Sequence, residues 1–330
     1  MTDDEVLPST RAAWALEVTE RAQRHWTDER LADLMRGKSL PLSPRDAAPL
    51  LRALGLLHRD ASMPKAQVRK YLQINHMIAV LGPSLKELCA EHERLDLVDA
   101  ACGRSYLTLA LAWHLSHNER RAVRILGVDR NEALLDALRR RILAAGLDDV
   151  VRCEAAPLDA LDVHAAWSRA FGDVEAPTIH GLVSLHACDT ATCDALALGV
   201  SLGATLVAAA PCCQAELARQ WAALANDGSS GAFAPIHRVP HLRRETAATL
   251  TDTLRALLLR GAGYECWPLM FVPSEHTPKN TLLRAMRRDR PDPHALDEYV
   301  ALVRATGGAE ITLASRLPTI ERALREARAR

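Results

Sequence analysis

The feature that most constrains the fold is an alternation of short apolar runs with segments of helical period in the middle of the chain. The runs and segments, in order, are Leu95–Ala100, Tyr106–His117, Val123–Val128, Glu132–Ala145 and Val150–Cys153. Short apolar runs separated by amphipathic helices are typical of a parallel, doubly wound sheet with a helix after each strand. The sequence therefore predicts an α/β fold.

Four more apolar runs follow and extend the predicted sheet. They are Gly181–Leu185, Thr205–Ala209, Glu265–Val272 and Thr281–Met286. The last two are joined only by Pro273–Asn280, which is too short for a crossover helix, so we expect the last strand to run antiparallel to its neighbour. The predicted fold class is a Rossmann-like, doubly wound, mostly parallel sheet with an antiparallel last strand.

Both ends of the chain have a helical pattern. From Thr10 to about Gly82, apolar residues recur every three or four positions, with breaks at Leu40–Pro44 and Met63–Pro64. The tail from Pro291 is also helical, apart from Gly307–Gly308.

These patterns predict three parts. They are a helical N-terminal region over 1–82, a cofactor-binding domain over 83–290 and a helical extension over 291–330. Ser84 and Glu87 fit a capping box, which predicts that a new helix begins near the first of these boundaries.

Composition excludes several classes of protein. Lys plus Arg and Asp plus Glu are balanced at 41 each, so no global field attracts a polyanion or a membrane surface. The eight cysteines form no regular framework, there is no basic-then-apolar leader, and no apolar run approaches the roughly 18 residues of a membrane span. We expect a cytoplasmic protein without a membrane partner or an evident obligate protein partner. Nucleic-acid contacts would need local basic segments such as Arg238–Arg244.

The turn after the first predicted strand has the composition of a cofactor loop. Asp99 ends the strand, and Ala101, Cys102 and Gly103 are small enough for backbone amides to approach a ligand closely. The helix that follows favours a carboxylate at its start, while Asp99 would attract the cationic end of the same ligand.

A second carboxylate ends the next strand. Asp129, followed by Arg130, stands where doubly wound folds hold the ribose diol of an adenosine, and Glu154 follows the third strand at a position suited to the adenine edge. Asp129 and Glu132 also fit a capping box, so Asp129 could instead cap a helix. A dehydrogenase would show G-x-G-x-x-G after the first strand, and its absence disfavours NAD.

Four segments of the sequence together resemble a known family. Asp99–Ser105 is similar to motif I of S-adenosylmethionine (SAM) methyltransferases, D/E-x-G-x-G-x-G, with Ala101 and Ser105 at two glycine positions. The other three segments are Leu185-His-Ala-Cys-Asp-Thr-Ala-Thr192, Ala210-Pro-Cys-Cys-Gln214 and Pro273-Ser-Glu-His-Thr-Pro-Lys-Asn280. They resemble the methyltransferase-domain family with LHAC and PCC strand ends, over about Lys65 to Arg288. The resemblance implies a class I fold, SAM as cofactor and methyl transfer, and distant relatives that modify RNA make RNA a candidate acceptor.

The remaining polar residues follow the fourth, fifth and sixth strands, whose ends we expect to meet at one cleft. The candidates for catalysis are His186 or Asp189 as a base and Cys212 or Cys213 as a nucleophile. His186 is also a candidate for contact with the cofactor. The candidates for substrate binding are Gln214, His276, Lys279 and Asn280.

Other interpretations of the same residues stay open. His186 and Cys188, Cys193, Cys212 and Cys213 offer zinc ligands but lack C-x₂-C spacing, so no metal is expected. The paired cysteines also suit buried packing positions, and His186 a hydrogen-bonded structural role. At the level of function, a small-molecule or protein acceptor, or a domain that binds SAM or RNA without catalysis, competes with an RNA methyltransferase.

Overall fold

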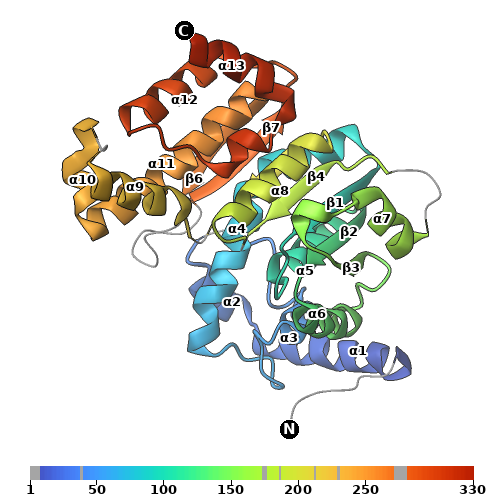
Figure 1. The fold of residues 1–330 in the computed structure, drawn as a ribbon. Helices are drawn as coiled ribbons and strands as arrows, with labels where there is room; N and C mark the ends of the chain where they lie inside the picture. The colour runs from blue at the N-terminus through green and yellow to red at the C-terminus, as the bar shows by residue number, and fades with distance from the viewer. Residues whose placement is uncertain are drawn as a thin grey trace. The chain divides into compact units, whose positions relative to one another are not determined.

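A computed structural model describes residues 8–37, 40–172, 177–185, 187–211, 213–228, 231–270 and 281–330. Its strands are β1 (Arg94–Ala100), β2 (Ala122–Asp129), β3 (Val151–Ala155), β4 (Gly181–Ser184), β5 (Leu206–Ala209), β6 (Tyr264–Met270) and β7 (Thr281–Arg287). They form a seven-stranded sheet of order β3-β2-β1-β4-β5-β7-β6 (Figure 1).

The α-helices alternate with these strands and extend beyond them at both ends. Before and among the first three strands lie α1 (Pro8–His25), α2 (Asp28–Met35), α3 (Ala48–Ala53), α4 (Lys65–Glu91), α5 (Tyr106–Trp113), α6 (Glu132–Ala145) and α7 (Val163–Phe171). The later helices are α8 (Thr190–Ser201), α9 (Glu216–Asp227), α10 (Ala234–Arg238), α11 (Pro240–Gly261), α12 (Pro293–Ala305) and α13 (Glu321–Ala329). A π-helical turn, His114–Asn118, extends α5, and short 3₁₀ turns cover Leu158–Ala160, Gly231–Phe233, Thr312–Ser315 and Pro318–Ile320.

Strand pairing confirms the predicted fold class. Strand β2 pairs in parallel with β3, and β4 pairs in parallel with β5. Strand β7 runs antiparallel to both β5 and β6, as the short connection before it required. The predicted helix Glu132–Ala145 has the same bounds in the structure, and every predicted strand overlaps an observed one.

The chain divides into two compact units. The first comprises Met1–Asp99, Gly103–Ala156 and Asp162–Pro177, and the second comprises Ala100–Cys102, Pro157–Leu161 and Thr178–Arg330. Strands β1 to β3 thus belong essentially to the first unit, and β4 to β7 belong to the second. The predicted domain boundaries at 82/83 and 290/291 stay predictions.

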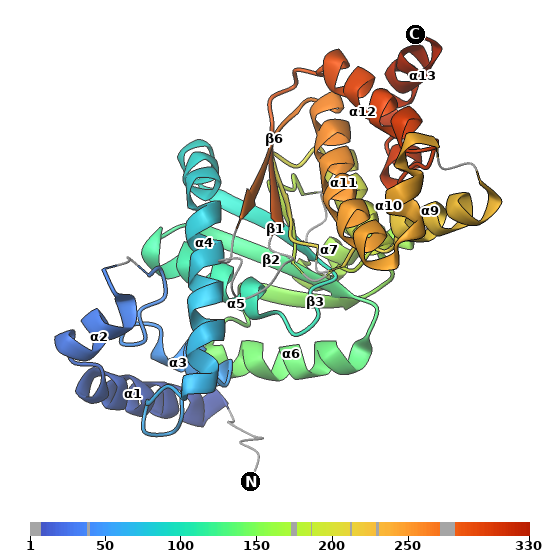
Figure 2. The ribbon, with the colours of Figure 1, turned by 90° about the vertical axis from the view of Figure 1, so that its left-hand side faces the viewer.

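In the first unit, the long helix α4 anchors the helical N-terminal region (Figure 2). Its Tyr71 hydroxyl donates to the Leu42 carbonyl at 2.6 Å, and its Asn75 side chain accepts from the Leu42 amide at 2.7 Å. All three residues are buried. The predicted break at Leu40–Pro44 is therefore a connection bonded to α4.

The predicted helix start at Ser84 is wrong. Helix α4 runs without interruption from Lys65 to Glu91, with Pro83 inside it and Ser84 buried. A proline in a helix removes one backbone hydrogen bond, but apolar residues on both sides of Pro83, such as Leu81 and Leu85, are buried along the same helix. Their burial outweighs the local signal for a break.

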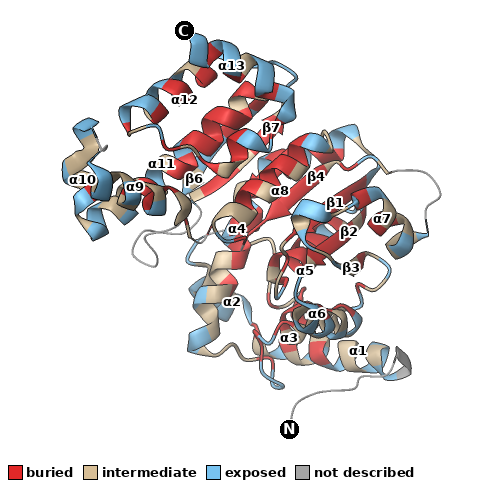
Figure 3. Cartoon of the chain, in the orientation of Figure 1, coloured by how far each residue is buried: buried red, intermediate tan, exposed pale blue. Residues whose placement is uncertain are grey.

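The second unit has its own hydrophobic core, built from β5, β6 and β7 and from helices α8, α9, α11, α12 and α13 (Figure 3). Trp221 and Tyr299 are among its largest fully buried side chains. Gly199 lets α8 approach the sheet, since a Cβ at this position would lie 2.8 Å from Val207 Cγ2. None of the described helices has the length and hydropathy needed to cross a bilayer.

Candidate active site

The loop after β1 adopts the backbone conformation that motif I requires. Ala101, Gly103 and Ser105 all have left-handed φ angles, of 57°, 55° and 52°. These are the three positions at which motif I usually carries glycine, because a residue without Cβ enters this region freely. At Ala101 and Ser105, the chain therefore adopts the left-handed conformation with residues whose Cβ atoms make it energetically unfavourable.

Asp99, the last acidic residue of β1, is a buried carboxylate, with 4% of the residue exposed. The Thr108 hydroxyl donates a hydrogen bond to it from the first turns of α5. Burial raises the pKa of Asp99 to about 7, and the neighbouring Asp129 carboxylate adds to this effect although Thr108 opposes it. Asp99 thus exchanges its proton near neutral pH.

Asp129 links the end of β2 to the same loop. It accepts hydrogen bonds from the Gly103 amide at 2.8 Å and from the Asn131 amide at 2.9 Å. The cap of helix α6 is Asn131, whose side chain accepts from the Leu134 amide, so the alternative role of Asp129 as a helix cap is wrong. Asp99 and Asp129 therefore lie near each other beside Gly103, as the cofactor hypothesis requires.

The other predicted cofactor residues have different surroundings. Ala101 is half-buried, Cys102 is buried and Arg130 is exposed. Glu154 pairs with Val128 in the sheet register, one residue before Asp129, so its side chain leaves the opposite face of the sheet from that of Asp129. It forms an ion pair with Arg169 of α7. The adenine-edge role of Glu154 stays a prediction.

A group of cationic side chains lies beside the cofactor loop. Lys70 of α4 places its ammonium 3.2 Å from the ring centroid of Tyr106, and the Arg141 guanidinium of α6 lies 5.2 Å from the same centroid. Burial alone would raise the pKa of Tyr106, but Lys70 and the nearby arginines lower it. Arg141 also donates to the Arg104 carbonyl at 3.0 Å. Tyr106 begins α5, so this group fixes the end of the cofactor loop.

These contacts leave a place for a cationic ligand. Within the described part of the chain, the side chains that act on Asp99 are those of Thr108 and Asp129, and none is a cation. A buried carboxylate without a cation is costly when ionised, and a bound cation would remove that cost. The amides and left-handed turns next to it can accept a polar ligand at close approach.

In the second unit, Asp189 ties together the loops that follow β4 and β5. Its Oδ1 accepts from the amides of Ala215 and Glu216 at 2.9 and 2.8 Å, and its Oδ2 pairs with Arg219 at 2.7 Å. Its own amide donates to the Cys213 carbonyl at 3.1 Å. Burial would raise the pKa of Asp189, but these bonds outweigh it and lower the pKa. A general base at neutral pH needs the opposite shift, so the contacts favour a positioning role.

A buried polar network supports this junction. The Arg255 guanidinium is completely buried in α11 and donates to the Asp189 carbonyl at 2.7 Å and to Asp252 at 3.1 Å. Gln214 Nε2 donates to Asp252 at 2.8 Å. Gln214 Oε1 is buried and accepts no hydrogen bond from the described residues. Gln214 therefore keeps an acceptor available on the loop where substrate binding was predicted.

The cysteines differ in exposure, and some of the predicted site residues lie outside the described part of the chain. Cys188 is exposed, Cys193 buried and Cys213 half-buried, and the described residues contain no group of three or more metal ligands. Several predicted residues lie outside the described ones: His186, Cys212, His276, Lys279 and Asn280. Their roles stay predictions.

Comparison with protein families assigns a family to the part of the chain that contains the cofactor loop. Residues 69–220 match the family model of a methyltransferase domain, which spans the cofactor loop, Asp129 and the loops after β4 and β5. Residues 69–220 are thus a methyltransferase domain, and its methyl donor is SAM. The match ends within α9, so it excludes β6, β7 and the C-terminal helices. No curated protein matches the chain.

Solved structures with a similar architecture include several methyltransferases. One is a methyltransferase of Podospora anserina bound to S-adenosylhomocysteine, 12% identical, covering 79% of this chain and 95% of its own, with a TM-score of 0.41. Another is an O-methyltransferase family protein from Burkholderia thailandensis, 13% identical, covering 87% and 74%, with a TM-score of 0.35. A third is geranyl diphosphate C-methyltransferase from Streptomyces coelicolor, 17% identical, covering 82% and 98%, with a TM-score of 0.31.

The residues of the first unit fit this donor. SAM supplies a methyl group activated by a positively charged sulfur. The buried Asp99 carboxylate is suited to its ammonium group, the Gly103 region to its carboxylate, and Asp129 to the ribose hydroxyls. The protein residues of this site bind and orient SAM, and positioning of the reactants is the main requirement of methyl transfer.

Proposed function

We propose that this chain transfers the methyl group of SAM to RNA. The assignment of SAM as donor rests on Asp99, which is buried near Asp129 and has a pKa of about 7. Both residues adjoin a loop with three left-handed residues. The RNA half is supported by exposed basic side chains, including Arg238 at the end of α10 and His241 and Arg244 near the start of α11. The irregular spacing of the eight cysteines along the sequence supports a cytosolic location.

The chemistry requires few groups. An oxygen or nitrogen of the acceptor forms a bond to the methyl carbon while the carbon–sulfur bond breaks, and its electron pair returns to sulfur. The acceptor's proton passes to a base. Because Asp189 is held by two amides and Arg219, His186 is the proposed base.

The test is incubation with tritiated SAM and separate RNA, protein and metabolite fractions. We expect label in RNA that ribonuclease releases and that the Asp129→Asn variant does not produce. Label confined to protein or to a small molecule would reject RNA as the acceptor while keeping methyl transfer.

A second candidate function is SAM binding without catalysis. It is favoured by the left-handed Ala101 and Ser105, which show a donor loop built with unusual residues. Normal SAM affinity combined with no transfer to any cell fraction would support this candidate over the enzyme.

A further inference from the structure

An open cavity of about 520 Å³ lies in the helical N-terminal region, remote in sequence from the donor loop. It is lined by Arg21, Arg24, His25, Arg30, Arg59 and Asp60. Four guanidinium groups around one cavity make anionic ligands the chemically matched class.

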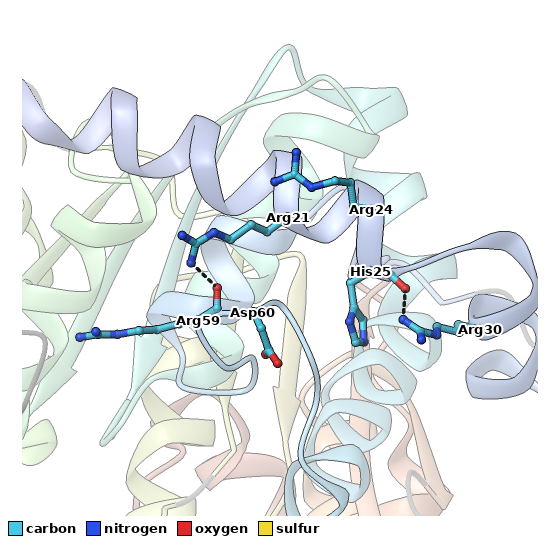
Figure 4. A pocket seen from close by; sticks show the side chains of 6 residues that line it. All are labelled: Arg21, Arg24, His25, Arg30, Arg59 and Asp60. Carbon is cyan, nitrogen blue, oxygen red and sulfur yellow. Dashed lines mark hydrogen bonds between the residues drawn. The ribbon is translucent and has the colours of Figure 1, made fainter.

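Three segments place these side chains (Figure 4). Arg24 and His25 come from the end of α1, Arg30 from α2, and Arg59 from the turn before α4. Because α1, α2 and this turn all belong to the first unit, the cavity is a feature of that unit alone.

Two hydrogen bonds from arginine side chains to backbone carbonyls connect the segments that line the cavity. Arg21 donates to the Arg59 carbonyl at 2.9 Å, and Arg30 donates to the His25 carbonyl at 2.8 Å (Figure 4). Each guanidinium has five N–H donors, so these bonds leave donors for a ligand. The two arginines are thereby ordered before a ligand arrives, which reduces the entropy lost on binding.

The acidic groups nearby neutralise the cavity only in part. Asp60 accepts from the Ser62 amide and hydroxyl at 3.0 and 2.6 Å, which lowers the pKa of Asp60 and occupies its carboxylate. Arg21 forms an ion pair with Glu17. Arg24 lies 4.0 Å from Glu20, the limit of an ion pair, and its side chain is 70% exposed. Among the described residues, Arg30 has no carboxylate at ion-pair distance. Positive charge therefore remains available.

The arrangement fits a chain of phosphates better than one small anion. Figure 4 shows the guanidinium groups of Arg24, Arg30 and Arg59 lying apart from one another rather than converging on one point. A single phosphate is best held by convergent donors, whereas successive phosphates of a polynucleotide meet separated arginines. The half-buried ring of His25 packs edge-on against Trp26, so it forms part of the cavity wall.

We propose that this cavity binds the phosphate backbone of single-stranded RNA. The inference rests on the proposed RNA acceptor and assigns the N-terminal helical region the task of holding it. The interaction is electrostatic and does not select sequence.

The test measures anisotropy of a labelled oligouridylate of about 15 nucleotides, without SAM, between about 50 and 200 mM salt. The test variant is Arg24→Gln/Arg59→Gln, which keeps both backbone anchors of the cavity. The control is Arg322→Gln/Arg325→Gln on α13, where two exposed arginines also face glutamates four residues away.

We expect the test variant to bind roughly tenfold more weakly, with the slope of log affinity against log salt reduced by about 1.4, or about 0.7 for each lost phosphate contact. The control variant should match the unmodified protein. Equal losses in both variants, no loss in the test variant, or binding of inorganic phosphate without binding of RNA would overturn the proposal.

The same proteins separate this inference from the proposed function. If the unmodified protein binds RNA at the cavity but transfers no tritium to it, the surface stands and the acceptor assignment fails. If methyl transfer to RNA occurs and the test variant still binds normally, the surface assignment fails. SAM affinity should be the same in all three proteins, which shows that each is folded.

Discussion

At the scale of single residues, the donor site is governed by the charge of Asp99. Burial beside Asp129 means that Asp99 holds a proton at slightly acidic pH, where a carboxyl group in an unfolded chain has lost it. This raised pKa stabilises the folded protein at low pH, and the stabilisation declines as pH rises from about 4 through about 7. A bound cation needs the ionised form, so donor binding and proton loss are linked.

The first prediction follows from this linkage. SAM affinity should rise about tenfold between pH 5.5 and pH 7, because the ionised fraction of Asp99 rises across that range while the donor's own amino group stays protonated. Isothermal titration of the unmodified protein and Asp99→Asn measures it. The variant should bind weakly with little pH dependence, and an equally steep pH profile in both proteins would contradict the role of Asp99.

The second prediction concerns the donor loop. Ala101→Gly should increase the free energy of unfolding by about 1 kcal/mol, since glycine removes the clash of Cβ at a φ of 57°. The matched control is Ala133→Gly at an exposed position of α6, which should decrease it by about 1 kcal/mol. Denaturant unfolding distinguishes the two signs. A loss of stability in both variants would show that the loop is not strained at Ala101.

At the scale of elements, Asp189 connects β4 and α8 to the loop before α9. Its residue has a φ of 55° and ψ of −117°, an unusual conformation, and its carboxylate caps α9 through the Ala215 and Glu216 amides. Arg255 holds the same residue through its carbonyl. The loops after β4 and β5 are thus joined by the Asp189 carboxylate, and Arg255 of α11 holds the Asp189 carbonyl.

The third prediction separates positioning from catalysis at Asp189. Asp189→Ala should lower the free energy of unfolding by roughly 2–3 kcal/mol, because two helix-start amides and Arg219 lose their acceptor. Asp189→Asn keeps one oxygen for the amides and should recover about half of that loss. Denaturant unfolding checks both variants. Unchanged stability in the alanine variant would favour the predicted catalytic role instead.

The sequence predicted the elements well where the pattern was local. Each strand was located within two residues at its described ends, and the antiparallel β7 followed from a connection length. The failure at Ser84 has a physical cause, since a capping box signals a helix start only where the preceding residues are not helical. Burial of the apolar face of α4 decided otherwise, and no local pattern reports it.

The candidate site was predictable only in part. Asp99, Gly103 and Asp129 follow strands and could be found by spacing. Lys70, from a distant helix, could not, because its contact with Tyr106 depends on packing. Arg255 carried a signal that went unused, since a lone arginine in the apolar run Leu254-Arg-Ala-Leu-Leu-Leu259 must be buried with a partner.

At the scale of the whole molecule, a methyltransferase domain carries additional structure at both ends. The N-terminal helices contribute the arginine-lined cavity, and the C-terminal helices complete the core of the second unit. The overall charge is balanced, so any RNA contact depends on local clusters and should weaken steeply with salt.

The central claim is that Asp129 and Asp99 form one site for SAM. Isothermal titration of SAM into the unmodified protein, Asp129→Asn and the control Asp136→Asn tests it most directly. Asp136 is an exposed residue of α6, so its substitution should leave affinity unchanged. We expect Asp129→Asn to bind at least tenfold more weakly, because the ribose acceptor and the bond to Gly103 are altered together. Equal affinity in all three proteins, or no SAM binding by the unmodified protein, would contradict the account.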